Sequence, residues 1–331
     1  MTVRLGIIGS GGMALTWAEA GARYLGDRAA IVAIAGGSRV QQLAAQYGAD
    51  AEPSVGALLA RADIDAIVVT SPQPNHHEHV LAAAAAGKHI LCEKPMAATL
   101  AESDEMSAAA ERAGITLGVV SQHRFRPTPL AAKRLIEDGV IGDVRMAQVR
   151  GLMPPWDMPR RNLPWADLGA HLCDILRWLV GSEVALVAAQ FHDFGAGDPP
   201  GQSAFVIVRF ESGALAHIWF SYEITEPGLG SIMQFLVTGS KGMIDLDSYA
   251  ACRLGNEDGW TTIAEQQPPD PSDALDPLRM EQYANQLGDF VDAVREGREP
   301  LVSAREGRAT MAMLEAAIRS ARTGTFVAPE R

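Results

Sequence analysis

Hydrophobic and polar positions divide the chain into two parts with different patterns. Through residue 121, short apolar runs alternate with longer segments in which apolar residues recur at helical spacing. Such runs predict strands buried on both faces, and their alternation with helices predicts β-α-β units on a parallel sheet. The predicted strands are residues 3–9, 31–36, 66–70, 89–91 and 116–120, and the predicted helices are residues 14–25, 40–47, 76–86 and 100–113, the last with Thr99 as its N-cap.

Beyond residue 121 the pattern changes. Helices are predicted at 130–138 and 168–180, each followed by a glycine, and strands at 144–151, 204–210, 214–221, 233–237 and 243–246. The short turn at 211–213 predicts an antiparallel hairpin, and helices at 279–295 and 304–322 follow. Segments 153–165 and 266–277 are rich in proline and are expected to be irregular. The fold class is therefore α/β, with an N-terminal Rossmann domain (1–121), a doubly wound parallel sheet. An α+β domain (122–331) with a large, mostly antiparallel sheet follows.

Composition narrows the classes of protein to which this chain can belong. It has 331 residues, 47% of them hydrophobic and 21% charged, as in ordinary globular proteins. The net charge of −12, without a basic stripe, argues against a nucleic-acid or anionic-membrane surface. No apolar run approaches the ~20 residues of a membrane span, and the first run is too short for a secretory signal. We therefore expect a cytoplasmic protein that binds neither nucleic acid nor membrane.

A glycine-rich turn follows the first predicted strand. Its residues are Gly9, Ser10, Gly11, Gly12 and Met13, and Ala14 then completes the pattern G-x-G-x-x-A. Glycines allow the tight turn and the close approach of a pyrophosphate, and a small third residue allows the helix to pack on the strand. Because the pattern lies between a strand and a helix, it predicts a dinucleotide site.

The residues after the second predicted strand bear on which dinucleotide is bound. NAD sites usually place an acidic residue there to bond the adenosine ribose, whereas this chain has Gly36-Gly37-Ser38-Arg39. Ser38 and Arg39 could instead bind a 2′-phosphate, although Arg39 could also be a solvated residue at the start of a helix. We expect NADP to be preferred over NAD.

Further motifs resemble those of the Gfo/Idh/MocA family, which includes glucose–fructose oxidoreductase and inositol dehydrogenase. They cover nearly the whole chain and are, in order, Ser71-Pro72 with His76, residues 86–95 with Glu93-Lys94-Pro95, Arg124-Phe125 with Pro127, residues 139–144, Asp167 to Asp174, Gly239 to Gly242, and residues 289–293. The resemblance implies an NAD(P)-dependent oxidoreductase. One departure is the sequence Asn162-Leu163-Pro164-Trp165, where family members often have glycines, so the substrate wall cannot be inferred from relatives.

Lys94 is the principal catalytic candidate. Pro95 biases the backbone of Lys94 away from helix, and the position after a predicted strand places it at the carboxyl edge of the parallel sheet, where ligands of such sheets bind. An ammonium beside a substrate hydroxyl stabilises developing negative charge and can relay a proton. We therefore assign Lys94 to catalysis, to the substrate site and to the cofactor site.

Asp167 and His171 form the second catalytic candidate. They are four residues apart on a predicted helix, so both side chains project from one face. A carboxylate can orient an imidazole that exchanges a proton with substrate. The resemblance assigns His171 as the acid/base and Asp167 as its partner, while Asp174 on the same helix is expected to be structural.

The remaining site assignments complete two sets. The cofactor set adds Ser71, Pro72, His76, Glu93, Gln122, Arg161 and Trp165 to the glycine turn and to Ser38 and Arg39. The substrate set adds His123, Trp156 and Arg160 to Lys94 and His171. His76 and His79 share a helix face, but their neighbourhood does not supply a third ligand, so no metal site is expected.

These observations together predict an NAD(P)-dependent dehydrogenase or reductase that acts on a hydroxyl or ketone of a sugar, inositol or related polyol. Two alternatives are a glycosidase of the same fold that oxidises its substrate transiently, and a non-catalytic dinucleotide-binding regulatory protein. We also expect a homo-oligomer, a dimer or tetramer, assembled through an open face of the second domain's sheet. Phe205, Ile207, Ile218 and Phe220 are the apolar residues expected on that face.

Overall fold

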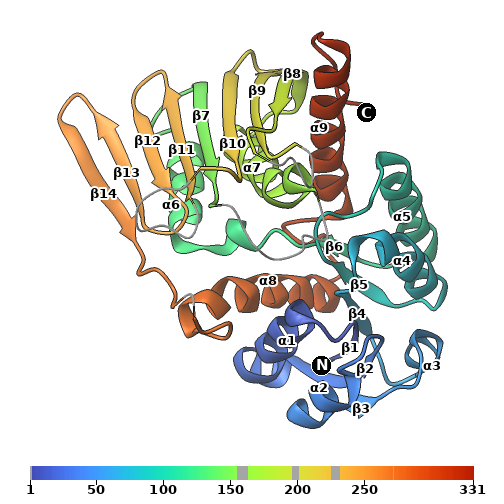
Figure 1. Ribbon diagram of the computed structural model, residues 1–331. Helices are drawn as coiled ribbons and strands as arrows, with labels where there is room; N and C mark the ends of the chain where they lie inside the picture. The colour runs from blue at the N-terminus through green and yellow to red at the C-terminus, as the bar shows by residue number, and fades with distance from the viewer. Residues whose placement is uncertain (1, 155–162, 196–200, 225–231, 271) are drawn as a thin grey trace. The chain divides into compact units, whose positions relative to one another are not determined.

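The computed structural model describes residues 2–154, 163–195, 201–224, 232–270 and 272–331 (Figure 1). The chain forms two compact units. The first comprises residues 1–122 and 272–311, and the second comprises residues 123–271 and 312–331. The division expected from sequence, at residue 121, is contiguous and does not include segment 272–311 in the first unit.

The first unit contains a six-stranded parallel sheet with strand order β3-β2-β1-β4-β5-β6. This is the order of a doubly wound dinucleotide-binding fold, so the predicted Rossmann sheet is confirmed. The strands are β1 (Val3–Ile8), β2 (Ala29–Ala35), β3 (Asp50–Ala51), β4 (Ala66–Val69), β5 (His89–Cys92) and β6 (Leu117–Val119). The helices are α1 (Gly12–Glu19), α2 (Val40–Tyr47), α3 (Val55–Leu59), α4 (His76–Ala85), α5 (Leu100–Ala113) and α8 (Pro277–Glu296). A π-helical turn, η1 (Ala20–Tyr24), continues α1.

Local sequence signals set the limits of several of these helices. Thr99 forms a capping box with Glu102, in which each side chain bonds the other's backbone, and this confirms Thr99 as the N-cap of α5. Gly114 ends α5 in the left-handed conformation, with φ of 63°. β3 and α3 were not predicted, because two and five residues are too short to show a hydrophobic period.

Segment 272–311 joins the first unit through the hydrophobic core. Helix α8 contacts α1, η1 and β1. Met280, Leu287 and Phe290 of α8 belong to the same buried cluster as Leu5 of β1 and Trp17 of α1. The apolar face of α8 therefore completes a core that the first 121 residues do not close by themselves.

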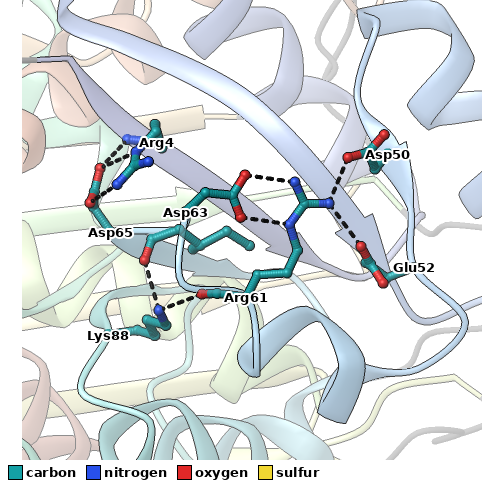
Figure 2. A network of polar contacts seen from close by, with 8 residues as sticks. Arg4, Asp50, Glu52, Arg61, Asp63, Asp65 and Lys88 are labelled. Carbon is teal, nitrogen blue, oxygen red and sulfur yellow. Dashed lines mark hydrogen bonds and ion pairs between the residues drawn. The ribbon is translucent and has the colours of Figure 1, made fainter.

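Charged residues gather at the amino ends of the parallel strands. Figure 2 shows Arg61 bonded to Asp63, Asp50 and Glu52, at 2.7 to 2.8 Å. Nearby, Arg4 bonds Asp65, and Lys88 donates to two backbone carbonyl oxygens. These contacts fix the loops that precede β4 and β5 and hold the short edge strand β3. The amino edge of the sheet is thus filled by structural ion pairs, and ligand chemistry is left to the opposite edge.

The second unit contains an eight-stranded sheet with order β14-β13-β12-β11-β7-β10-β9-β8. Every neighbouring pair is antiparallel except β7 with β10, so the mostly antiparallel sheet is confirmed. The strands are β7 (Val144–Leu152), β8 (Val184–His192), β9 (Ser203–Phe210), β10 (Leu215–Ser221), β11 (Ile232–Gly239), β12 (Met243–Asp247), β13 (Ala251–Asn256) and β14 (Gly259–Glu265). β8, β13 and β14 were not predicted.

Two helices of this unit, α6 (Pro127–Glu137) and α7 (Pro164–Val180), contact each other and the sheet (Figure 1). Helix α9 (Ala304–Thr323) is divided between the units at residue 311. Because α7 begins at Pro164, the segment expected to be irregular through residue 165 ends two residues earlier than predicted, and residues 155–162 of it lie outside the described residues. Among the described helices, none is long and apolar enough to cross a membrane.

The register of β9 and β10 corrects the prediction of the open face. Phe205 and Ile207 are 60% and 50% exposed, as expected, but Ile218 and Phe220 are fully buried. Val206 lies opposite Ile218, whereas Phe205 lies opposite Trp219. Directly opposed residues share a face, so Ile218 and Phe220 belong to the helix-covered core, and assigning them to the open face was wrong.

Candidate active site

The predicted cofactor residues of the first unit lie at the carboxyl ends of its parallel strands. Gly9 follows β1, Ser71 lies just beyond β4, and Glu93 and Lys94 follow β5. Carboxyl ends of parallel strands meet at one edge of a sheet, so the fold gathers these residues on the side where open α/β sheets bind ligands. The strand order reverses between β1 and β4, which makes this the topological switch point.

The glycine turn has the geometry that an anion site requires. Gly9 has φ of 122°, and a Cβ there would lie 2.4 Å from the hydroxyl oxygen of Thr70, so glycine is required. A Cβ at Gly11 or Gly12 would meet no described atom within 4 Å. Gly11, the N-cap of α1, supplies no side-chain bond to the first turn of that helix. Backbone N–H groups at this helix start can therefore donate hydrogen bonds to a phosphate oxygen. Met13, in the first turn, is half-buried against the core.

The residues after β2 surround a small hollow beside the glycine turn. Gly36 and Gly37 have φ of 81° and 86°, and a Cβ at position 37 would lie 2.4 Å from the Ser10 hydroxyl. Arg39 is fixed to the same serine, because its backbone N–H donates to the Ser10 hydroxyl and its Nε donates to the Ser10 carbonyl. Ser38 and Arg39 are exposed. The hollow is lined by Ser10, Gly11, Leu15, Arg39, Gln42, Leu43 and Gln46.

The segment after β5 is held on both sides of Lys94. The buried Glu93 carboxylate accepts a hydrogen bond from Trp17 Nε1 at 2.7 Å and another from the Lys94 backbone N–H at 3.1 Å. On the other side, His76 Nδ1 lies 3.0 Å from the Pro95 carbonyl oxygen, and its Nε2 lies 2.8 Å from the Ser71 carbonyl oxygen. These contacts place Lys94 between two fixed neighbours.

His76 is a structural contact within this edge. It is 1% exposed, and burial lowers its pKa against the opposing effect of nearby backbone carbonyl oxygens. Its ring links the backbone before Pro72 to the backbone at Pro95. His79 bonds the Ser71 hydroxyl, and His77 pairs with Glu105. In the described part of the chain no three His, Cys, Asp or Glu residues are grouped as metal ligands.

Gln122 offers a buried acceptor three residues beyond the end of β6. Its side chain is 7% exposed, and its amide oxygen has no hydrogen-bond partner among the described residues. Nearby, Gln286 of α8 accepts from the Ser121 N–H and donates to the Val119 carbonyl, which fixes the backbone just before it. A buried unpaired acceptor costs about 1–3 kcal/mol, so a donor on a ligand would be favoured here. The residues at this edge therefore fit a dinucleotide: backbone donors for phosphate at the glycine turn and an acceptor for an amide at Gln122.

The second unit places Asp167 and His171 on α7. Tyr222 follows β10 and is buried. Its hydroxyl donates a hydrogen bond to Asp167 Oδ2 at 3.1 Å. The His171 ring is buried and meets the ring of His123 edge to face, with centroids 4.6 Å apart. His123 Nδ1 in turn lies 3.3 Å from the Ser248 hydroxyl. The structure thus brings the predicted His123 beside His171. It adds Tyr222 and Ser248, which carry no local sequence signal.

Asp174, expected to be structural, forms a buried ion pair with Arg124. The guanidinium bonds both carboxylate oxygens, at 2.9 and 2.6 Å. Asp174 is one turn beyond His171 on α7, so this pair anchors the helix that carries the acid/base candidates.

Trp165 lies in the core of the second unit. It is 3% exposed, packs edge to face against Phe191 and Phe220, and donates its indole N–H to the Leu314 carbonyl. This packing gives Trp165 a structural role that its assignment to the cofactor set did not include. Trp156, Arg160 and Arg161 lie outside the described residues.

Comparisons with known proteins agree with this architecture. Residues 3–121 match the family model described as "Oxidoreductase family, NAD-binding Rossmann fold", and residues 133–328 match "Oxidoreductase family, C-terminal alpha/beta domain", the two models of Gfo/Idh/MocA proteins. Inositol 2-dehydrogenase of Rhizobium meliloti (strain 1021) is 32% identical over 340 residues, covering 97% of each chain.

Two other similar proteins have names that refer to other sugars. 1,5-Anhydro-D-fructose reductase of Ensifer adhaerens is 29% identical over 335 residues, again covering 97% of each chain. The crystal structure of levoglucosan dehydrogenase in complex with NADH and levoglucosan superposes with a TM-score of 0.88, covering 100% of both chains. At 23% identity this last likeness shows a shared fold.

Proposed function

The chain belongs to the Gfo/Idh/MocA oxidoreductase family, and from this premise we propose how its residues divide the work of the reaction. The protein is an NAD(P)-dependent oxidoreductase of sugars or polyols. Lys94 binds the reacting hydroxyl or ketone oxygen, and His171, oriented by Asp167, exchanges the proton. The observation that supports this best is the shared edge: the dinucleotide turn, the buried acceptor of Gln122 and the held Lys94 all follow strands of one parallel sheet.

The residues named have separate chemical tasks. Nicotinamide, when bound, supplies the acceptor or donor of the hydride. The Lys94 ammonium stabilises negative charge that develops on the substrate oxygen as its proton leaves. The His171 imidazole takes that proton in the oxidation direction and returns it in reduction. The Tyr222 hydroxyl, through its bond to Asp167, holds the carboxylate that orients His171.

A substrate screen tests the proposed chemistry. Inositols, aldoses, anhydro-sugars and other polyols are offered with NAD and NADP, and formation of NAD(P)H is followed by absorbance. Lys94→Ala is expected to bind dinucleotide normally and to lose roughly two or more orders of magnitude in kcat. Wild-type turnover in this variant would remove Lys94 from the mechanism. Glycoside cleavage without net NAD(P)H formation would show transient oxidation instead.

The cofactor preferred is NADP(H). Gly36 and Gly37 leave no acidic side chain after β2, and the tight approach of Gly37 to Ser10 leaves no room for one. The Arg39 backbone N–H and Nε donate to Ser10, and Arg39 is one of the residues that line the hollow beside the glycine turn. A charge-assisted contact to a 2′-phosphate contributes about 1.5–3 kcal/mol, or roughly ten- to a hundredfold in affinity.

Titration of both dinucleotides tests this preference. Arg39→Ala should weaken NADP(H) binding by roughly ten- to a hundredfold and leave NAD(H) binding nearly unchanged. Arg23→Ala is the matched control, because Arg23 is an exposed arginine of the same unit that pairs with Glu19. It should leave the ratio of affinities as in the wild type. Equal affinity of the wild type for both dinucleotides would refute the preference.

The open face of the second unit's sheet mediates homo-oligomerisation. Met146, Phe205, Ile207 and Leu215 are 46–60% exposed on neighbouring strands, and Phe205 stacks with Trp219. Exposed apolar groups in one patch favour association. Sedimentation at micromolar concentration should give a species larger than the 35.3 kDa chain. Ile207→Asp should shift it toward monomer, whereas Leu278→Asp, at an exposed leucine of α8, should not. A monomeric wild type would end this idea.

A further inference from the structure

The indole of Trp17 connects the dinucleotide-binding helix to the catalytic lysine segment. Trp17 is fully buried in α1, the helix that begins at the glycine turn. Its Nε1 donates to Glu93 Oε1 at 2.7 Å, and the other oxygen of the same carboxylate accepts from the Lys94 backbone N–H at 3.1 Å. One carboxylate therefore spans from α1 to the residue that is proposed to touch substrate.

This contact is strongly constrained on each side. Trp17 is fully buried and packs edge to face against Tyr283 of α8, with ring centroids 5.3 Å apart, so neighbouring side chains hold the indole. Glu93 is 6% exposed, and its backbone N–H donates to the Val69 carbonyl of β4. A buried carboxylate without hydrogen-bond donors is costly, so the bonds from Trp17 and from the Lys94 backbone are each favoured. Displacement of α1 would then displace Glu93 and the start of the Lys94 backbone.

We propose that Trp17 is a positioning residue for Lys94, acting through Glu93, and that it ties the lysine segment to the helix that begins at the glycine turn. The inference rests on the catalytic role proposed for Lys94. Trp17 lies on the helix whose first turn follows the glycine turn, about one and a half turns further on. The indole N–H transmits that position to Glu93, and Glu93 passes it to the Lys94 backbone. His76 fixes the other side of the lysine through the Pro95 carbonyl.

The test compares variants that remove or keep the N–H donor. Trp17→Phe keeps an aromatic ring and removes the donor. Trp17→His restores it, because an imidazole superposes on the five-membered part of indole with Nε2 in place of Nε1. We expect Trp17→Phe to lower kcat roughly tenfold or more, with dinucleotide Kd and substrate KM within about twofold of wild type, and Trp17→His to recover most of kcat.

Tyr47→Phe is the matched control. It removes an aromatic hydroxyl that donates a hydrogen bond of 2.7 Å to Glu19. Glu19 is a buried carboxylate of α1, whereas Glu93 follows β5. This variant loses a comparable bond in the same unit without touching Glu93, so its kcat should stay within about twofold of wild type. Where Trp17→Phe does not yield folded protein, Glu93→Gln breaks the same link, because an amide oxygen replaces only one of two accepting oxygens. It should lower kcat in the same way.

A double-mutant cycle separates this inference from the proposed role of Lys94. If Trp17 acts through Lys94, Trp17→Phe should lower kcat much less in a Lys94→Ala background than in the wild type. Wild-type kcat in Trp17→Phe, or an undiminished loss in the Lys94→Ala background, would overturn the inference. Wild-type kcat in Lys94→Ala alone would instead refute the role of Lys94, whatever the Trp17 variants do.

Discussion

Replacing Asp174 by Asn is the sharpest stability test that the structure offers. The Arg124 and Asp174 side chains are 2% and 6% exposed, and two hydrogen bonds of 2.9 and 2.6 Å join them. Asparagine keeps the shape of the side chain but removes the charge. Arg124 remains charged at any ordinary pH, so the buried guanidinium of the variant loses the carboxylate with which it forms two hydrogen bonds. Breaking one side of a buried ion pair in this way costs about 3–5 kcal/mol.

That cost corresponds to a large shift in the melting temperature. For a unit of this size each kcal/mol lowers Tm by roughly 2–4 °C, so Asp174→Asn should lower it by roughly 6–20 °C. Calorimetry gives Tm, and urea titration followed by circular dichroism gives the free energy of unfolding. Asp245→Asn is the control, because Asp245 pairs with Arg253 on the surface of the same unit, where such a pair contributes at most about 1 kcal/mol.

Two results would refute this reasoning. One is a loss in Asp174→Asn no larger than that in Asp245→Asn. The other is a double variant, Arg124→Met with Asp174→Leu, that is as unstable as the single one, because removing both charges should restore much of the loss.

Three further predictions concern the acid/base residues and acid stability. His171→Ala should lower kcat by roughly two or more orders of magnitude and flatten the pH–rate profile. Asp167→Asn should lower kcat by less, and the losses should be less than additive in the double mutant. Additive losses in kcat would show that the two residues do not act as a unit. Tyr222→Phe should lower kcat roughly tenfold in the wild type and little in Asp167→Asn, by steady-state kinetics; equal losses would contradict its role. Arg61 holds the pKa of Asp63 at about 2, below the ordinary 3.8, so this contribution to stability is present above pH 4 and is lost as pH falls toward 2. Arg61→Gln should make melting temperature less dependent on pH in that window, and an unchanged dependence would contradict it.

Local signals in the sequence were sufficient to predict the parallel sheet. Each of its central strands is an apolar run between turns, and helix α5 begins at a cap that neighbouring residues supply, Thr99 with Glu102. The glycine turn was predictable for the same reason, since the positive φ of Gly9 and the close approach of Thr70 allow only glycine at that position. Lys94 was placed at the sheet edge by its position after a strand.

Contacts between segments that are far apart in the sequence could not be predicted in this way. The edge strand β14 has mostly exposed side chains, and in its neighbour β13 only Cys252 and Gly255 are buried, so both strands have weak hydrophobic patterns. The faces of β9 and β10 depend on register, and one residue of shift exchanges the buried and exposed sets, which is why Ile218 and Phe220 were misassigned. Segment 272–311 joins the first unit because the face of α8 matches a core built from residues nearly 300 positions earlier.

The sequence by itself was sufficient to indicate the oxidoreductase family, because the dinucleotide turn and the motifs that contain Lys94, Asp167 and His171 resemble those of that family. Only the tertiary structure decided what holds these groups in place. Trp17 meets Glu93 across 76 positions and Tyr222 meets Asp167 across 55, and each pair is brought together by packing of separate elements. A hydrogen bond between distant residues leaves no periodic or local signal, so it becomes visible only when the fold places donor and acceptor within about 3 Å of each other.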